Sequence, residues 1–214
     1  MAERVVIVGA GGHGREVLDI IEAIGGFEVL GFVDDGTPDV ALFADRGHRL
    51  LGGTDALASF GEVLVVVGVG DPRVRADVVE RISAPPAPPL VHPLASVGSS
   101  CRIGAGSVVA AGARLTTNIT VGRHCYVGPN ATLGHDAVLQ DFATLYPGAV
   151  VSGSVHLGRA VTVGAGASVK QGITVGAAAV VGMGAAATHD VPAGATVVGV
   201  PARRIGSRSA GATR

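Results

Sequence analysis

A six-residue period runs through the second half of the chain and limits the folds that the sequence can adopt. Cut from Val91, the sequence gives 16 consecutive units, of which the last starts at Val181, and every unit opens with Val, Ile or Leu. The fifth position is small or β-branched in most units, as at Ala113 and Ile119, and Gly often follows the opening residue. A sandwich would show longer alternating strands. The repeat therefore predicts a triangular solenoid whose opening residues point inward, with glycine and polar residues in the turns.

Three units in each turn of the solenoid would make an 18-residue coil. The 16 units would then form just over five coils, stacked about 4.8 Å apart like neighbouring strands. Residues that are 18 apart in sequence would be vertical neighbours on the same side of the solenoid. This 18-residue rule predicts which side chains can meet.

Composition supports such a core and excludes several classes of protein. There are 34 glycines among 214 residues, no Trp and only 3% aromatic residues. A net charge of −1 argues against nucleic-acid binding, and no apolar run reaches the roughly 18 residues of a membrane span. The first residues lack the apolar stretch of a secretory signal, so we expect a cytoplasmic protein without membrane insertion. The separation of Cys101 and Cys125 is not a whole number of coils, which predicts different faces and no disulfide, and no Cys/His spacing indicates a metal.

Residues 1–83 alternate apolar runs with helical periodicity, which predicts a small Rossmann-like α/β domain with a parallel sheet. The expected strands are 4–9, 28–35 and 62–70, and the expected helices are 12–25, 54–60 and 71–82. A proline-rich linker at 84–90 would join this domain to the solenoid at 91–198. Residues 199–214 would form a C-terminal segment, disordered from about 206 because its residues are small and polar.

The glycine pattern G-x-G-x-x-G occupies residues 9–14, between the first expected strand and the first expected helix. Bare backbone at a helix N-terminus can face a phosphate, and His13 is placed to contact it. Asp34 and Asp35 end the next strand, where an acid that binds ribose is expected. About 80 residues supply too few strands for a dinucleotide fold. The pattern therefore favours a nucleotide or nucleotide sugar over NAD, and a purely structural glycine turn is the alternative.

His135 is followed by Asp136 at a turn position of its unit, and a carboxylate beside a histidine can tune it as a base. A surface histidine with an incidental acidic neighbour is the alternative. By the 18-residue rule Gly153 lies one coil further on, which would leave open space and an accessible N–H beside the histidine. His124 and His156 take other positions and are expected to face solvent. The other histidines, His48, His92 and His189, are expected in loops, at the linker end or in a cap.

In these motifs the chain resembles a family of bacterial sugar O-/N-acetyltransferases, of the sialic-acid O-acetyltransferase and bacillosamine/perosamine N-acetyltransferase type. The resemblance covers about residues 1–205 and rests on VVIVGAGGHGREVLDII, FVDD, GVGDPRVR, VHPLASVG, GHDAVLQDF, YPGAVVSG and VPAGATVVGVPARRI. It implies a left-handed parallel β-helix, a homotrimer, acetyl-CoA bound between neighbouring helices, and an N-terminal domain that holds a nucleotide-activated amino sugar.

The resemblance also implies roles for particular residues. His135 would be the general base, Asp136 would orient it, and the Gly153 N–H would meet the thioester carbonyl. The other residues expected to bind acetyl-CoA are Thr144, Ala165, Gly182 and Gly184. The residues expected to bind the nucleotide sugar are Gly11, Gly12, His13, Gly14, Asp34, Asp35 and Gly70. Thr144 departs from the family pattern, in which a second histidine often stands at this position.

The function expected from this resemblance is acetyl transfer from acetyl-CoA to the amine of a nucleotide-activated sugar of the UDP-4-amino-sugar or GDP-perosamine class. Transfer would be direct, because the sequence shows no nucleophile placed for an acyl-enzyme. O-acetylation of a sialic-acid-like sugar is the nearest alternative. A non-catalytic β-helix scaffold is the alternative from another class. The sugar, the nucleotide and the pathway product are left open.

Overall fold

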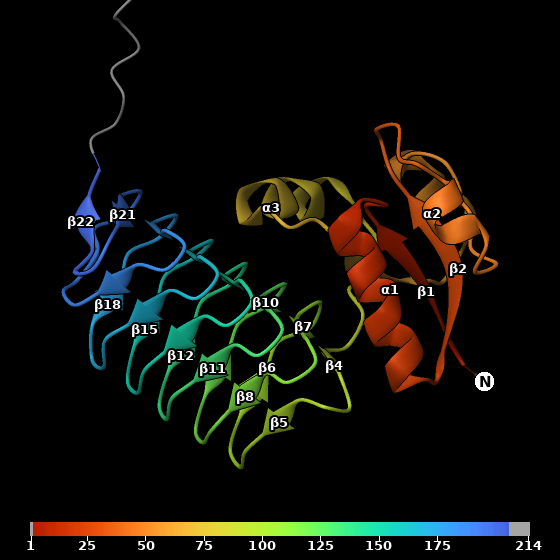
Figure 1. Cartoon of the computed structure of the whole chain (residues 1–214). Coiled ribbons are helices and arrows are strands. Elements are labelled where there is room, and N and C mark those ends of the chain that lie inside the picture. Colours follow the sequence, from red (N-terminus) through yellow and green to blue (C-terminus); the bar gives the residue numbers. More distant parts are fainter. Residues whose placement is uncertain (1, 206–214) are drawn as a thin grey trace, which may run out of the picture.

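The computed structural model describes residues 2–205, so the predicted disorder from about 206 lies outside the described residues. The chain forms an α/β domain followed by a parallel β-helix, as the sequence predicts, and the β-helix has about six turns (Figure 1). No helix within residues 2–205 is long and apolar enough to span a bilayer. The same residues contain no group of three or more His, Cys, Asp or Glu side chains placed to hold a metal ion.

The N-terminal domain has a three-stranded parallel sheet in the order β2-β1-β3. Its elements are β1 (Glu3–Val8), α1 (Gly12–Ile24), β2 (Phe27–Val33), α2 (Ala41–Ala44), η1 (Thr54–Ser59), β3 (Leu64–Val67) and α3 (Pro72–Arg81). The expected strands and helices are present at these places, and α2 is an addition that the sequence pattern did not predict. The continuous apolar run of β1 is buried because helices and loops cover both faces of the sheet.

The N-termini of α3 and α1 differ in how they are capped. Asp71 caps α3 by accepting hydrogen bonds from the N–H groups of Arg73 and Val74, and Pro72 takes the first helical position. Gly11 precedes α1 without a capping side chain. No capping side chain therefore accepts hydrogen bonds from the first N–H groups of α1.

The β-helix is a triangular prism of short strands. The first face contains β4 (Leu90–Val91), β7 (Val108–Val109), β10 (Tyr126–Val127), β13 (Thr144–Leu145), β16 (Thr162–Val163), β19 (Val180–Val181) and β21 (Thr196–Val198), and the antiparallel β22 (Arg203–Arg204) closes it. The second face contains β5 (Ser96–Val97), β8 (Arg114–Leu115), β11 (Thr132–Leu133), β14 (Val150–Val151), β17 (Ser168–Val169) and β20 (Ala186–Ala187). The third face contains β6 (Arg102–Ile103), β9 (Thr120–Val121), β12 (Val138–Leu139), β15 (His156–Leu157) and β18 (Thr174–Val175).

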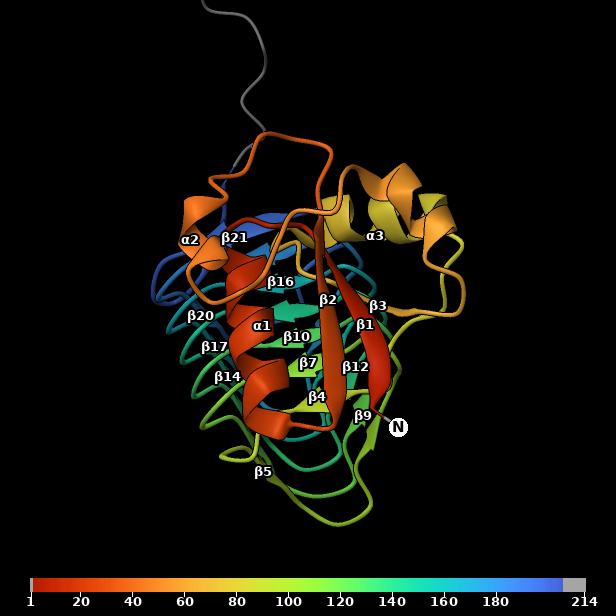
Figure 2. The same cartoon turned by 90° about the vertical axis from the view of Figure 1, so that its right-hand side faces the viewer.

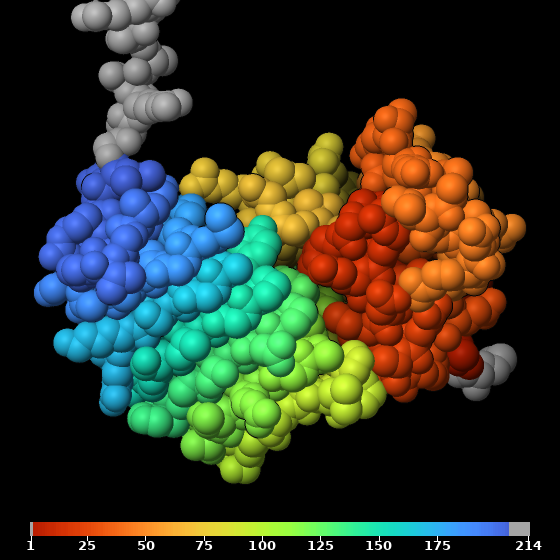
Figure 3. All heavy atoms as spheres, viewed as in Figure 1, coloured from red at the N-terminus to blue at the C-terminus, as the bar shows by residue number. Residues whose placement is uncertain are grey.

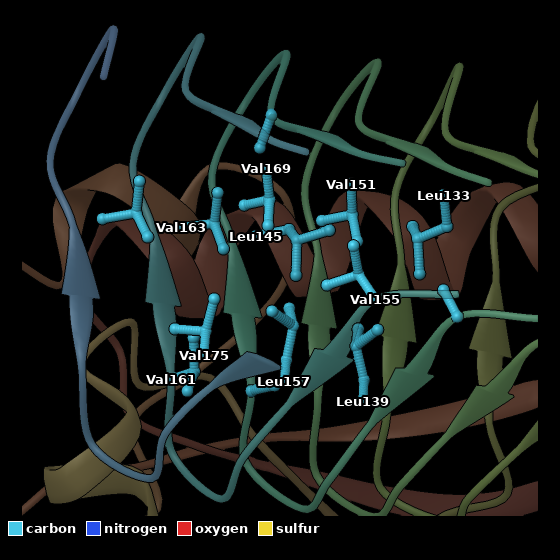
Figure 4. Close-up of a cluster of buried hydrophobic side chains, with 14 of the residues drawn as sticks. Leu133, Leu139, Leu145, Val151, Val155, Leu157, Val161, Val163, Val169 and Val175 are labelled. Atoms are coloured by element: carbon cyan, nitrogen blue, oxygen red, sulfur yellow. The ribbon is translucent and has the colours of Figure 1, made fainter. Parts of the chain in front are cut away.

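Strand register confirms the 18-residue rule. Leu133 pairs with Leu115 on one side and with Val151 on the other. The opening residues of the units fill the prism and stack on one another from coil to coil (Figure 4). The final coil is slightly shorter than the others, since Val181 pairs with Val197. This short coil starts with the last predicted unit, at Val181, and brings the β-helix to about six turns, where the repeat predicted just over five.

Turns between the faces form three edges of the prism. We call the edge from the first to the second face the first edge, that from the second to the third face the second edge, and that from the third back to the first face the third edge. The fourth residue of many six-residue units has a left-handed backbone, as at Asn118, His124 and Asp136. Asn and Asp tolerate this conformation better than most residues, which explains their recurrence there.

The N-terminal domain lies on the first face of the β-helix (Figure 2). Side chains of β1 and α1 join one hydrophobic cluster with Leu90, Val108 and Tyr126 of that face. The α3 helix contacts the third edge, where Ala76 packs against Phe142 and Ala160. In the space-filling view α1 (red) adjoins the green coils and α3 (yellow) extends over later ones (Figure 3). The domain is thus fixed to the coils that also carry the candidate catalytic residues.

Candidate functional site

His135 and Asp136 lie in the turn between β11 and β12, on the second edge. The Nδ1 atom of His135 is 2.6 Å from Oδ2 of Asp136, and the Asn118 amide donates a hydrogen bond of 2.7 Å to Oδ1 of the same carboxylate. The hydrogen bonds from Asn118 and His135 lower the pKa of Asp136. The carboxylate is therefore ionised at neutral pH and can only accept, so Nδ1 of His135 carries the proton. Nε2 is left with a free lone pair, as a general base requires.

Gly153 lies directly beside that lone pair. A Cβ atom built on Gly153 would lie 2.6 Å from Nε2 of His135 and 2.7 Å from Cε1. No left-handed φ requires glycine there, and larger residues such as Arg159 take the equivalent turn position elsewhere. The space occupied by the imidazole is therefore the reason for glycine at this position. The 18-residue rule predicted this neighbour correctly.

The N–H of Gly153 has no hydrogen-bond acceptor within residues 2–205. At the equivalent turn position of the third edge, the Arg123 N–H donates a hydrogen bond of 2.7 Å to the carboxylate of Asp141. An N–H at this position can therefore donate to an oxygen that lies against the edge, and Gly153, which is itself buried, has no such oxygen among the described residues. The second edge thus presents a base and a free backbone donor side by side.

The glycine loop of the N-terminal domain serves two purposes. Gly11 and Gly12 are exposed, and a Cβ on Gly11 would have no neighbour within 4 Å. Gly14 is buried, and a Cβ on it would collide with the carbonyl oxygen of Gly9. Gly14 therefore allows close packing of α1 on the sheet, while Gly11 and Gly12 leave the helix N-terminus open to an anion. A side chain that sequence reasoning missed, Arg15, lies 3.9 Å from a Cβ built on Gly12.

The acids predicted to reach a nucleoside hold loops in place. Asp34 accepts the N–H of Ala10 at 2.7 Å and that of Gly36 at 2.8 Å. Asp35 accepts the N–H of Thr54 at 2.7 Å together with the Thr54 hydroxyl. Asp34 therefore fixes the glycine loop to the end of β2, and direct contact with a nucleoside stays a prediction.

His13 and Gly70 face the β-helix. The His13 ring packs edge-on against Tyr126, with centroids 4.3 Å apart, and Nδ1 lies 3.2 Å from Glu16. Burial lowers the pKa of His13. A Cβ built on Gly70 would lie 3.9 Å from the Tyr146 hydroxyl and 4.0 Å from His13. Since Tyr146 begins a turn of the first edge, these predicted sugar-binding residues meet at that edge.

Apart from Gly153, the residues predicted to bind acetyl-CoA do not lie near His135 within one chain. Ala165, Gly182 and Gly184 lie in the turns after β16 and β19, on the first edge, whereas His135 lies on the second edge. The predicted contact of Thr144 with acetyl-CoA is wrong. Its side chain is fully buried under the N-terminal domain, and its hydroxyl accepts a hydrogen bond of 2.6 Å from Arg75.

The prediction that His124 faces solvent is also wrong. Only 4% of the residue is exposed, its ring stacks on Phe142 with centroids 5.3 Å apart, and Nδ1 has no partner within residues 2–205. Burial and the nearby arginines Arg123 and Arg75 lower its pKa to about 4. His156, in contrast, is partly exposed and contacts Gln140 at 3.0 Å. Periodicity places a residue in its coil but does not reveal what docks on that coil.

Sequence reasoning missed two further residues, although signals for both were present. Asn118 precedes Asp136 by one full coil, so the 18-residue rule would have found it. Arg75 lies on α3 between Pro72 and Val78, which are both buried and each one helical turn away. Helical spacing therefore places its charge on a buried face.

A parallel β-helix of six-residue units with a histidine–carboxylate pair at one edge defines a β-helix acyltransferase. The family of the PglD N-terminal domain matches residues 4–82. Over 213 residues the chain is 32% identical to a GDP-perosamine N-acetyltransferase of Escherichia coli O157:H7, covering 93% of this chain and 95% of the relative. The chain therefore belongs to the family of left-handed β-helix sugar N-acetyltransferases that includes this enzyme.

Two solved structures have the same two-domain fold. A variant of perosamine N-acetyltransferase from Caulobacter crescentus, in complex with CoA and GDP-perosamine, is 29% identical with a TM-score of 0.88, covering 97% of this chain and 99% of that one. The acetyltransferase domain of PglB from Neisseria gonorrhoeae FA1090, in complex with acetyl coenzyme A, is 34% identical with a TM-score of 0.88, covering 96% and 100%.

Proposed function

We propose that the protein transfers an acetyl group from acetyl-CoA to the amine of a nucleotide-activated 4-amino sugar. The observation that carries this proposal is the free Nε2 of His135 beside the free N–H of Gly153 within the described residues 2–205. The complexes of the relatives with CoA, acetyl-CoA and GDP-perosamine support the two substrates. N-acetylation is favoured over O-acetylation because the matched enzymes are named N-acetyltransferases. We further propose that the reaction takes place in the cytoplasm, as expected from the sequence.

The geometry supports direct transfer. The sugar amine attacks the thioester carbonyl carbon while Nε2 of His135 takes a proton from the amine, and Asp136 stabilises the resulting imidazolium. The Gly153 N–H donates to the carbonyl oxygen as it gains negative charge. When the C–S bond breaks, the imidazolium returns the proton to the leaving CoA thiolate. A new amide and free CoA are the products.

We further propose that the complete site forms between copies in a homotrimer. Ala165, Gly182 and Gly184 on the first edge and His135 on the second edge are separated in one chain, so a long acetyl-CoA could contact both sets by lying between neighbouring prisms. The sugar nucleotide would extend from Gly11, Gly12 and the neutral His13 along the first edge.

Complementation tests the shared site. His135→Ala and Ala165→Trp should each strongly lower turnover, and mixing the two variants under subunit exchange should restore part of it. Light scattering should give three subunits. An active monomer, or no recovery in exchanged mixed trimers, would contradict the arrangement.

The activity itself is tested by release of CoA thiol with a panel of acceptors. GDP-perosamine comes first, then UDP-4-amino sugars, with sialic acid as the hydroxyl acceptor. His135→Ala should lower kcat by about 10²–10⁴-fold, the usual contribution of a general base, with folding unchanged. Near wild-type turnover of this variant would remove His135 from the mechanism, and inactivity of the wild type on every acceptor would favour a scaffold role.

A further inference from the structure

Arg75 is the only Lys, Arg, Asp or Glu within residues 2–205 that is buried, with 2% of the residue exposed. It projects from α3 into the contact between the N-terminal domain and the β-helix. Removing a guanidinium from water costs several kcal/mol, so other interactions must offset the burial of this arginine.

The guanidinium of Arg75 makes five hydrogen bonds to two different parts of the molecule. Its Nη1 donates to the loop after β3, at the carbonyls of Val69 (2.7 Å) and Gly70 (3.2 Å). The other two nitrogens donate to the β-helix, and their acceptors are the carbonyls of His124 (2.9 Å) and Phe142 (2.9 Å) and the hydroxyl of Thr144 (2.6 Å). One side chain therefore links the 69–70 loop to two successive turns of the third edge and to the first face.

None of these acceptors is a carboxylate. Burial lowers the pKa of Arg75 to about 10, so the side chain remains charged at neutral pH. The charge is stabilised by oriented carbonyl dipoles that require a planar donor with a fixed fork, which lysine cannot provide. Such an arrangement specifies one geometry between the two parts, whereas an apolar contact would tolerate sliding.

The linked loop leads to the predicted sugar-nucleotide site. Gly70 lies beside His13 and Tyr146 at the first edge, and His13 follows the exposed Gly12. Movement of the 69–70 loop would therefore move the anion-binding helix end relative to the edge where the acetyl group must arrive.

We propose that Arg75 is a positioning residue that sets where the N-terminal domain holds the sugar nucleotide over the β-helix. This inference rests on the proposed function. It assigns Arg75 no contact with a substrate. It explains why the loop after β3 is fixed through a buried charge.

Arg75→Lys tests the proposal, since it keeps the charge and loses the fork. Arg73→Lys is the matched control, because Arg73 is exposed on the same helix and, among the described residues, its side chain makes a single hydrogen bond to the β-helix, to the Ala178 carbonyl at 2.8 Å. In Arg75→Lys, kcat/KM for the sugar nucleotide should fall about 10²-fold, as expected when reacting atoms are misplaced by about 1 Å. The KM for acetyl-CoA should be unchanged, and Arg73→Lys should resemble the wild type. Thr144→Val, which removes one acceptor, should give a smaller loss of the same kind.

A purely structural role would lower the melting temperature and the active fraction while leaving kcat per active site and both KM values unchanged, and that result would overturn the proposal. Hydrogen exchange without substrates separates this test from the proposed function. Arg75→Lys should exchange faster in peptides covering 68–72 and 10–14, and Arg73→Lys should not. Unchanged exchange in Arg75→Lys would overturn the proposal whatever the activity of the enzyme.

Discussion

Gly153→Ala gives a sharp test of the catalytic geometry, because it adds one methyl group at a known distance from the base. The new Cβ would lie 2.6 Å from Nε2 of His135, and ordinary contact begins at 3.4 Å, so the ring must retreat by about 3.4 − 2.6 = 0.8 Å. The side chain of His135 is 53% exposed and can move, so the fold should not suffer. A displacement near 1 Å is expected to cost about 10²-fold in kcat.

The assay is steady-state release of CoA thiol, with the melting temperature measured as a control for folding. Alanine keeps the backbone N–H, so any loss comes from the methyl group. In a His135→Ala background the same change should cost nothing further, because no ring remains to be displaced. Turnover near that of the wild type would refute the geometry. An equal further loss in the His135→Ala background would show that the methyl group blocks the acetyl group itself.

Three further predictions concern the N-terminal domain and pH. Gly12→Val should fold normally and raise KM for the sugar nucleotide while KM for acetyl-CoA barely moves, and kinetics with the reverse pattern would show that the domains are assigned the wrong way round. Gly14→Ala should lower the melting temperature, because its Cβ meets the Gly9 carbonyl; calorimetry showing an unchanged melting temperature would contradict this packing. The pKa of His124 is about 4 in the folded protein and about 6.5 in the unfolded chain. Because the unfolded chain therefore binds a proton first as the pH falls, the contribution of His124 to folding stability is complete above pH 6.5 and is lost as the pH falls toward 4. His124→Asn, which suits the left-handed φ, should lose less thermal stability than the wild type between pH 7 and pH 5.

Most of the fold could be predicted from the sequence, because a solenoid repeats one local structural unit. Each aliphatic opening residue points inward, and the period of 18 then places Gly153 beside His135 without further information. The alternation of strands and helices likewise predicted the small parallel sheet. These predictions rest on local pattern and on contacts between neighbouring coils.

What could not be predicted are the contacts between the two domains. Thr144 and His124 occupy outward positions of their units, which the period marks as solvent-facing, yet the N-terminal domain covers both. Arg75 carries a charge that would normally remain in water. Periodicity contains no information about which face another domain will cover, and the acetyl-CoA residues on separate edges depend in the same way on contacts between copies.

The strict register limits how a chain of this kind can change in length. Asn118 meets Asp136, and His135 meets Gly153, only because one full coil separates the members of each pair. A single extra hexapeptide between His135 and Gly153 would preserve the aliphatic core while moving the glycine to another edge. The protein would still fold, but the Gly153 N–H would no longer lie beside the His135 base. Insertions and deletions in such genes should therefore come as whole coils and should fall outside residues 118–153.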